Sequence, residues 1–265
     1  MVAAQRELFD RVSGIEARTE YEGIGEGGDR SLVIDCRAED IVFEELARLH
    51  EAGASFTAIS EERGEVVFGD GSSETRVVID PIDGSLNARR MLPSFALSVA
   101  VASGDSMADV ELAFVHDFGA GDEFVADHGA GAMLNGAELV ARGPGYALEL
   151  VGLEGAKPER LLPLLEGLAG KAFRCRGIGS LAITLCYVAA ARLDGMLSGR
   201  PARSVDVAAA QLIVREAGAS VQFDRFDLSE AHLGLEARYD VVAGLDEEML
   251  GTLLDVQRAA HTEQR

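Results

Sequence analysis

Two carboxylates stand three residues apart in Asp80-Pro81-Ile82-Asp83, directly after the apolar run Val77-Val78-Ile79. A β-branched run of this kind predicts a buried strand. Acids at the end of a buried strand need a cation or hydrogen-bond donors to hold them. The spacing therefore predicts the floor of a Mg²⁺-dependent phosphatase site, with Asp80, Asp83 and the Ile82 carbonyl as oxygen ligands of the metal.

Two further acids lie where other predicted elements begin or end. Glu61 follows a predicted strand over residues 56–59, and Asp206 precedes a predicted helix over residues 207–217. Mg²⁺ prefers near-octahedral oxygen coordination, so carboxylates that converge from separate segments suit it. Two such ions roughly 3.5–4 Å apart hold the attacking and leaving oxygens of a phosphoryl transfer. We therefore expect Glu61 and Asp206 to complete the site.

Gly84 and Ser85 follow the second acid, at a point where a helix could begin. The first N–H groups of a helix bind anions, so this turn would hold a phosphate without any lysine. The Ser85 hydroxyl could orient a water molecule, and Asp35, on an earlier element, could polarise that hydroxyl as a base. Taken alone, Asp35 is more typical of an acid on the surface.

Structural roles would also account for the other acids. Asp83 could cap a helix, and Asp80 could form a turn through its own side chain. Asp206 lies three residues after Arg203 and could form an ion pair with it on a helix. Glu61-Glu62 could be solvated turn residues. These alternatives remain open at the level of the sequence.

The spacing argues against two other kinds of carboxylate site. An EF-hand loop needs acids at positions 1, 3 and 5 before a glycine at position 6, with glutamate at position 12. Counting from Gly84 places Ile79, Pro81 and Asp83 at the acidic positions and Arg90 at the last one. A phosphatase of the haloacid dehalogenase type would need another aspartate where Pro81 stands. A water nucleophile at a metal site is therefore favoured over an aspartyl-phosphate route.

The composition limits the class of protein. The chain has 265 residues and a net charge of −21, which argues against nucleic-acid and anionic-membrane partners. Its 3 cysteines form no CxxC pattern, so neither a disulfide framework nor a zinc site is indicated. Residues 1–11 do not resemble a signal peptide, and no apolar run reaches the roughly 20 residues of a membrane span. We expect a cytoplasmic protein.

Helices and an antiparallel sheet are predicted for the first half, residues 1–142. The spacing of Leu8, Val12 and Ile15 predicts one helix, and apolar residues at 42, 46 and 49 predict a second. Between them we expect a mobile loop over residues 23–29 and an extended segment over residues 31–35. The β-rich segments that indicate an antiparallel meander are residues 94–102, 110–118 and 123–126.

A change in composition near Gly143-Pro144-Gly145 marks a candidate boundary. Beyond it, strand-like and helix-like segments alternate over residues 143–265, which indicates an α/β half. This second half would complete the site with Asp206.

The motifs resemble those of a known superfamily, the inositol monophosphatase and fructose-1,6-bisphosphatase phosphatases. Asp80-Pro81-Ile82-Asp83-Gly84-Ser85 matches its DPxDGT/S motif, and Ser60-Glu61-Glu62 matches its (G/S)EE motif. Val205-Asp206-Val207-Ala208-Ala209 matches its (W/V)DxAA motif. The matched motifs occur in the family's order, and the resemblance spans nearly the whole chain.

The resemblance implies a five-layer αβαβα sandwich, Mg²⁺ dependence through two or three ions, inhibition by Li⁺ and a homodimer. Asp35 and Ser85 would orient the nucleophilic water, with Glu61 as a further catalytic residue, while Gly84 and Asp83 would contact the substrate beside Ser85. The metal ligands that the resemblance implies are Glu61, Asp80, the Ile82 carbonyl, Asp83 and Asp206.

Val205 stands where inositol-type members of the family usually have Trp, and Ser60 stands where they usually have Gly. At these two positions the chain is similar to the archaeal-type enzymes, which act on both inositol phosphates and fructose 1,6-bisphosphate. Arg176 and Arg203 fall near positions where such enzymes place arginines for the far side of the substrate. Arginine suits a second phosphate, although either residue could equally form a surface ion pair. Asn87-Ala88-Arg89-Arg90 replaces a commonly uncharged segment, and its arginines would either alter substrate preference or face solvent.

The sequence thus predicts a Mg²⁺-dependent phosphomonoesterase that hydrolyses inositol monophosphate, fructose 1,6-bisphosphate or both with a metal-activated water. Its partner would be a small phosphorylated sugar or polyol. Two alternatives stay open. One is a phosphatase of the same fold for a nucleotide 3′-phosphate or histidinol phosphate, and the other is a non-catalytic, metal-binding regulatory relative.

Overall fold

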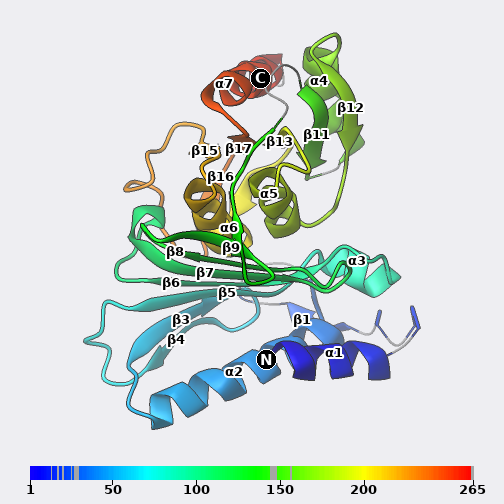
Figure 1. Cartoon of the computed structure of the whole chain (residues 1–265). Helices are drawn as coiled ribbons and strands as arrows, with labels where there is room; N and C mark the ends of the chain where they lie inside the picture. The colour runs from blue at the N-terminus through cyan, green and yellow to red at the C-terminus, as the bar shows by residue number, and fades with distance from the viewer. Residues whose placement is uncertain are drawn as a thin grey trace.

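The protein is a stack of helical and sheet layers (Figure 1). The computed structural model describes residues 1–265 except 13, 17, 20, 25, 27–29, 144–147, 156 and 264–265. From one outer face to the other, the layers are a helix pair, an eight-stranded sheet, a second helix pair, a five-stranded sheet and a third helix pair. This order confirms the predicted αβαβα sandwich.

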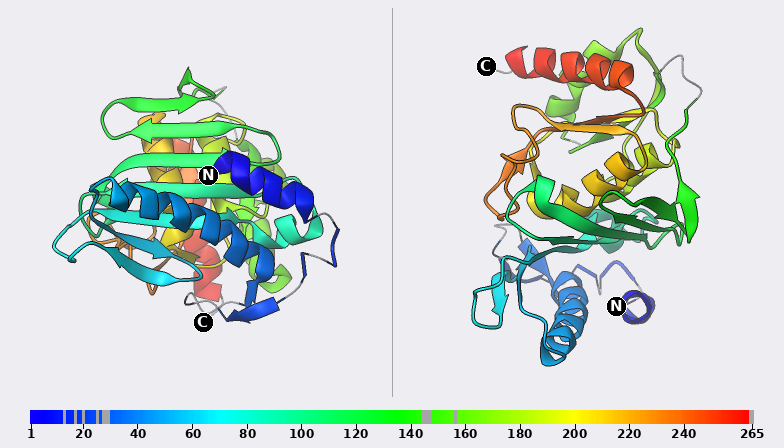
Figure 2. Two further views of the ribbon diagram at one scale, coloured as in Figure 1. Left: turned by 90° about the horizontal axis from the view of Figure 1, so that it is seen from below. Right: turned by 60° about the vertical axis from the view of Figure 1, so that its left-hand side comes forward.

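The first outer layer consists of α1 (Val2–Arg11) and α2 (Val33–Glu51), which lie across the face of the large sheet (Figure 2). α1 ends before Ile15 and is shorter than its apolar spacing predicts. α2 begins at Val33, so Asp35 lies in a helical first turn and not in the predicted extended segment. Between them, β1 (Tyr21–Ile24) and β2 (Arg30–Leu32) pair antiparallel. Residues 25 and 27–29 of the predicted loop lie outside the described residues.

The large sheet has the order β10-β9-β8-β7-β6-β5-β3-β4. Its strands are β3 (Phe56–Ser60), β4 (Gly64–Phe68), β5 (Arg76–Asp83), β6 (Ala96–Ala102), β7 (Val110–Asp117), β8 (Glu123–Asp127), β9 (Gly131–Leu134) and β10 (Ala137–Leu139). Neighbouring strands are antiparallel, as predicted for the meander, except that β3 runs parallel to β5. Parallel pairing puts the carboxyl ends of β3 and β5 at the same edge, where Ser60 lies beside Ile79.

The second sheet has the order β12-β11-β13-β17-β15. Its strands are β11 (Leu148–Glu154), β12 (Ala172–Arg176), β13 (Gly195–Ser198), β15 (Ser220–Phe223) and β17 (Val241–Gly244). β11 runs parallel to both β12 and β13. The outer helices on this sheet are α4 (Pro158–Leu168) and α7 (Glu247–Glu263), and short β14 (Ala202–Arg203) and β16 (Arg238–Tyr239) pair separately. The predicted boundary near residue 143 falls between β10 and β11, and residues 144–147 lie outside the described residues.

The central layer holds α5 (Leu181–Ala189) and α6 (Ser204–Glu216) between the two sheets. Both helices are buried over most of their length. A helix that is apolar on nearly all sides is stable only inside the protein, which explains why these two form the core. Within the described residues, no helix combines the length and the apolar composition that crossing a membrane requires.

Candidate active site

A β-bulge at the end of β5 turns both acids of the central motif to one side. Asp80 pairs with Ser98 and Asp83 pairs with Ala96, so β5 contains one more residue than β6 over this interval. In a regular strand, residues three apart point to opposite faces of the sheet. The extra residue cancels that alternation, and Pro81, which has no N–H to donate, is tolerated at a bulge. The two carboxylates can therefore face the same site.

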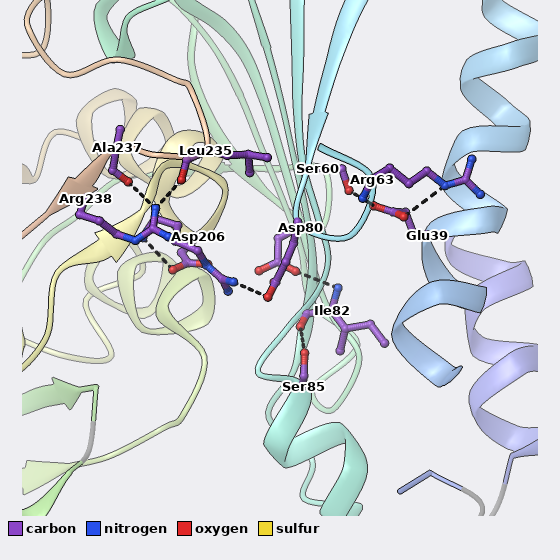
Figure 3. Close-up of polar contacts among 12 residues, drawn as sticks. Glu39, Ser60, Arg63, Asp80, Ile82, Ser85, Asp206, Leu235, Ala237 and Arg238 are labelled. Carbon is purple, nitrogen blue, oxygen red and sulfur yellow. Dashed lines mark hydrogen bonds and ion pairs between the residues drawn. The ribbon is translucent and has the colours of Figure 1, made fainter. Parts of the chain in front are cut away.

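Asp80, Asp83 and Asp206 each bring a carboxylate oxygen within 4.8 Å of the others. All are buried. Asp206 lies in the first turn of α6, and Figure 3 shows Asp80 and Asp206 reaching the cluster from β5 and α6. A buried set of carboxylate oxygens is the donor chemistry that Mg²⁺ prefers, so the residues present fit the metal that the sequence predicts.

The pKa values of the cluster reflect burial and mutual repulsion. Burial, followed by the charge of Asp206, raises the pKa of Asp83 to about 7. Burial, followed by Asp83 and Glu61, raises the pKa of Asp80 well above its ordinary value. A cation bound among these groups would stabilise their charged forms, because an opposite charge nearby offsets both effects.

Asp83 is held from the other half of the chain. The Ser180 hydroxyl donates to its Oδ2 at 2.5 Å, and the Ala182 N–H at the start of α5 donates to the same oxygen at 2.6 Å. The next helix, α3 (Ser85–Arg90), is capped by Gly84 and not by Asp83. Gly84 has a φ of 92°, and a Cβ there would lie 2.9 Å from the Ser94 carbonyl oxygen, so only glycine fits the turn.

Two structural alternatives raised by the sequence coexist with the cluster. The Ile82 N–H donates to Asp80 Oδ1 at 3.0 Å, which is the predicted side-chain turn. The Arg203 guanidinium, just before α6, pairs with Asp206 Oδ1 in the first turn of that helix at 3.1 Å, which is the predicted ion pair. Arg203 also pairs with Glu61, so Glu61 is drawn to the cluster and is not a solvated turn residue. Local hydrogen bonds thus orient the acids that converge here.

Asp35 and Ser85 lie together at the edge of the cluster. Asp35 is buried, and its Oδ1 has no hydrogen-bond partner among the described residues. Burial, then the charges of Glu62 and Glu61, raise the pKa of Asp35 to about 7, although a hydrogen bond with Ser85 lowers it in part. The Ser85 hydroxyl donates to the Ile82 carbonyl at 2.9 Å. A carboxyl group that titrates near neutral pH suits a general base.

These residues line a cavity of about 620 Å³. The predicted residues that line it are Asp35, Glu61, Asp80, Ile82, Asp83, Gly84, Ser85, Arg203 and Asp206. Arg89 lines it as well, whereas Arg90 is exposed and is not part of the lining. The structure does not bring Arg176 to the cavity: this residue is exposed on β12, and its guanidinium donates to the Cys175 carbonyl at 2.8 Å.

Comparison with known proteins agrees with this geometry. Residues 2–258 match the inositol monophosphatase family. The chain belongs to this family. It is therefore a metal-dependent phosphatase, as the sequence predicts.

Individual relatives are similar to this chain over most of its length. The fructose-1,6-bisphosphatase/inositol-1-monophosphatase of Thermococcus kodakarensis is 32% identical over 257 residues, covering 96% of this chain and 94% of that protein. Nus factor SuhB of Salmonella typhimurium is 35% identical over 195 residues, covering 71% and 69% of the two chains. A solved inositol monophosphatase-fructose 1,6-bisphosphatase has a TM-score of 0.81 at 29% identity and covers 95% of this chain and 94% of its own.

Several residues at this phosphatase's site were not predicted from the sequence, among them Ser180, Lys157 and Arg200. The Ser180 hydroxyl donates a hydrogen bond to Asp83. The Gly179-Ser180 pair just before α5 is the sequence feature that could have indicated this contact. Lys157 and Arg200 line the cavity soon after the carboxyl ends of β11 and β13, which are parallel neighbours. Ligands of α/β sheets bind beyond the carboxyl ends of parallel strands, and that rule could have indicated both positions.

Proposed function

We propose that this phosphatase hydrolyses inositol monophosphate and fructose 1,6-bisphosphate with Mg²⁺ as its cofactor. The observation that carries the proposal is the convergence of Asp80, Asp83 and Asp206 at one cavity. The relative from Thermococcus kodakarensis, which is named for both activities, supports this pair of substrates.

Two or three Mg²⁺ ions would be held by the carboxylates and the carbonyl that the motifs contribute. When bound, they neutralise phosphate charge and lower the pKa of a water molecule. The proposed ligands are Glu61, Asp80, the Ile82 carbonyl, Asp83 and Asp206.

The reaction otherwise depends on side chains and N–H groups of this chain. The Ser85 hydroxyl orients the attacking water, and Asp35, which shares a hydrogen bond with Ser85, accepts the proton through that hydroxyl as the general base. Gly84 and Ser85 hold the phosphate against the start of α3, where the first N–H groups of a helix lack acceptors within it. Catalysis consists of positioning and charge stabilisation, as expected for phosphoryl transfer.

Among the described residues, three cationic side chains besides Arg203 line the cavity, together with the carboxylate of Glu154. Arg89, Lys157 and Arg200 line it, each from a different segment, in a chain whose net charge is −21. Cationic side chains gathered at a cavity bind phosphate and carboxylate groups. We propose that they bind the second phosphate of fructose 1,6-bisphosphate, in place of the predicted Arg176. Arg203 instead directs its guanidinium to Glu61 and Asp206.

A phosphate-release assay with a panel of esters tests the proposal. Inositol 1-phosphate and fructose 1,6-bisphosphate should release phosphate with Mg²⁺ and not with a chelator. Preferential release from a nucleoside 3′-phosphate or histidinol phosphate would assign another substrate within the same fold. No release from any ester, together with Mg²⁺ binding by calorimetry, would identify a non-catalytic relative and contradict the proposal.

Three further expectations belong to the same proposal: inhibition by Li⁺, a homodimer and a cytoplasmic location. Repeating the assay with Li⁺ tests the first, light scattering on the purified protein tests the second, and cell fractionation tests the third. The division into residues 1–142 and 143–265 also stays a prediction.

A further inference from the structure

Glu39 is a buried carboxylate that the proposed chemistry leaves unused. It lies on α2 one turn after Asp35 and is only 1% exposed. It does not belong to the lining of the cavity. Burial raises the pKa of Glu39, so its location has an electrostatic cost that its contacts must offset.

The polar contacts of Glu39 among the described residues come from one turn of the chain, residues 60–63. The Ser60 hydroxyl and, at 3.3 Å, the Arg63 backbone N–H donate to its Oε1. The Arg63 Nε pairs with its Oε2 at 3.2 Å. Figure 3 shows these three residues between the large sheet and α2. The guanidinium of Arg63 also lies over the Phe43 ring of α2, 4.4 Å from its centroid.

Ser60 and Arg63 flank the two acids Glu61 and Glu62. Ser60 is the last residue of β3, and β4 begins directly after Arg63. One carboxylate on α2 therefore holds both ends of the turn that carries Glu61 and Glu62. We call Glu39, Ser60 and Arg63 the turn anchor.

The turn needs such an anchor because it faces another acid. Asp35, Glu61 and Glu62 all line the same cavity, so the turn and the start of α2 face a shared space. Like charges repel, so an unrestrained turn would move away from Asp35. Residues four apart on a helix share a face, so Asp35 and Glu39 are rigidly related. The anchor thereby sets the spacing between Asp35 and the two glutamates.

We propose that Glu39 is a positioning residue that holds Glu61 and Glu62 against Asp35 and so sets the affinity of this side of the site for a divalent cation. This inference rests on the proposed function, since it assumes that these acids bind Mg²⁺. Partners that orient metal ligands are worth about 10–100-fold in metal affinity when they are removed.

Mg²⁺ binding without substrate, measured by calorimetry, tests the turn anchor in the full-length protein. Ser60→Ala removes one hydroxyl, and Glu39→Gln removes one charge while keeping an acceptor. Both variants should bind Mg²⁺ about 10–100-fold more weakly than the wild type. Glu45→Gln is the matched control on the same helix, because Glu45 pairs only with Arg48 among the contacts described and lies away from the cavity.

Kinetics distinguish positioning from a general loss of structure. The Mg²⁺ concentration for half-maximal phosphate release should rise by the same factor as the dissociation constant. The substrate KM at saturating Mg²⁺ should stay unchanged, and high Mg²⁺ should restore turnover. A variant that is merely less stable would show a lower melting temperature with wild-type Mg²⁺ affinity, which would overturn the inference.

Wild-type Mg²⁺ affinity in Ser60→Ala would also overturn it, even if Glu39→Gln failed to fold. The proposed function fails by a different result, namely no phosphate release by the wild-type protein. Because the calorimetric test uses Mg²⁺ alone, the two failures are distinguishable.

Discussion

The guanidinium of Arg203 pairs with the Asp206 carboxylate at 3.1 Å, inside the cluster proposed to bind Mg²⁺. Arg203 also pairs with Glu61, so one positive charge joins α6 to the turn after β3. Burial alone would lower the pKa of Arg203, but the charges of Asp206, Glu61 and Asp80 raise it overall. A divalent cation bound at these proposed ligands would therefore compete with the arginine for the same carboxylates.

Arg203→Gln should lower the stability of the metal-free protein and increase its response to Mg²⁺. Removing one partner of a buried ion pair leaves the other charge uncompensated and costs about 3–5 kcal/mol. The cation would then bind without displacing the arginine, so the rise in melting temperature with Mg²⁺ should exceed that of the wild type. Thermal unfolding in chelator and in Mg²⁺ measures both effects. An equal rise in the two proteins would contradict the competition.

Asp83→Asn should nearly abolish turnover and leave the fold intact. The amide oxygen can still accept from Ser180 and Ala182, whereas one anionic ligand is lost. The loss of kcat should exceed about 100-fold, because changes to groups that only orient ligands already reach that size. Phosphate release at saturating Mg²⁺ and circular dichroism provide the measurements. Asp105→Asn, at an exposed residue paired with His232, is the control, and wild-type turnover in Asp83→Asn would refute the ligand assignment.

The stability gained from Mg²⁺ should increase with pH. The folded pKa values of Asp35 and Asp83 are raised to about 7, above the unfolded value of about 4. The folded metal-free protein therefore holds extra protons between about pH 4 and 7, and its stability falls as pH rises through this window. Melting temperatures in chelator and in Mg²⁺ should differ more at pH 8 than at pH 5.5. A difference that is independent of pH would contradict these pKa values.

Arg200→Gln should weaken the binding of fructose 1,6-bisphosphate and leave the KM for inositol monophosphate unchanged. Arg200 lines the cavity and packs against Gly155, where an added Cβ would lie only 2.6 Å from the Arg200 Cγ. Loss of one charge-assisted hydrogen bond to the second phosphate costs about 1.5–3 kcal/mol, so the bisphosphate KM should rise at least about tenfold. Steady-state kinetics with both substrates measure this selectivity. Arg176→Gln is the matched control, and equal effects of the two variants would exclude the assignment.

The sequence by itself determined which chemical groups are available and in what local setting. The β-branched run before Asp80 specifies a buried strand, and the Gly84-Ser85 pair specifies a tight turn into a helix, because both depend on nearest neighbours along the chain. The three motifs, read in order, also identified the family and so the layered fold. The helix start before Asp35 was missed, because its N-cap is Leu32, whose side chain has no oxygen to accept a capping hydrogen bond, although Ser31 stands one residue earlier.

Only the tertiary structure decided how these groups meet. The bulge that brings Asp80 and Asp83 to one face depends on pairing with β6, and the donors to Asp83 come from α5, about a hundred residues away. The same holds for the arginines: Arg203 pairs with Glu61, Arg176 does not line the cavity, and Arg200 lines it. Spacing along a chain defines which residues share an element, whereas the direction of a side chain between elements depends on how distant segments pack.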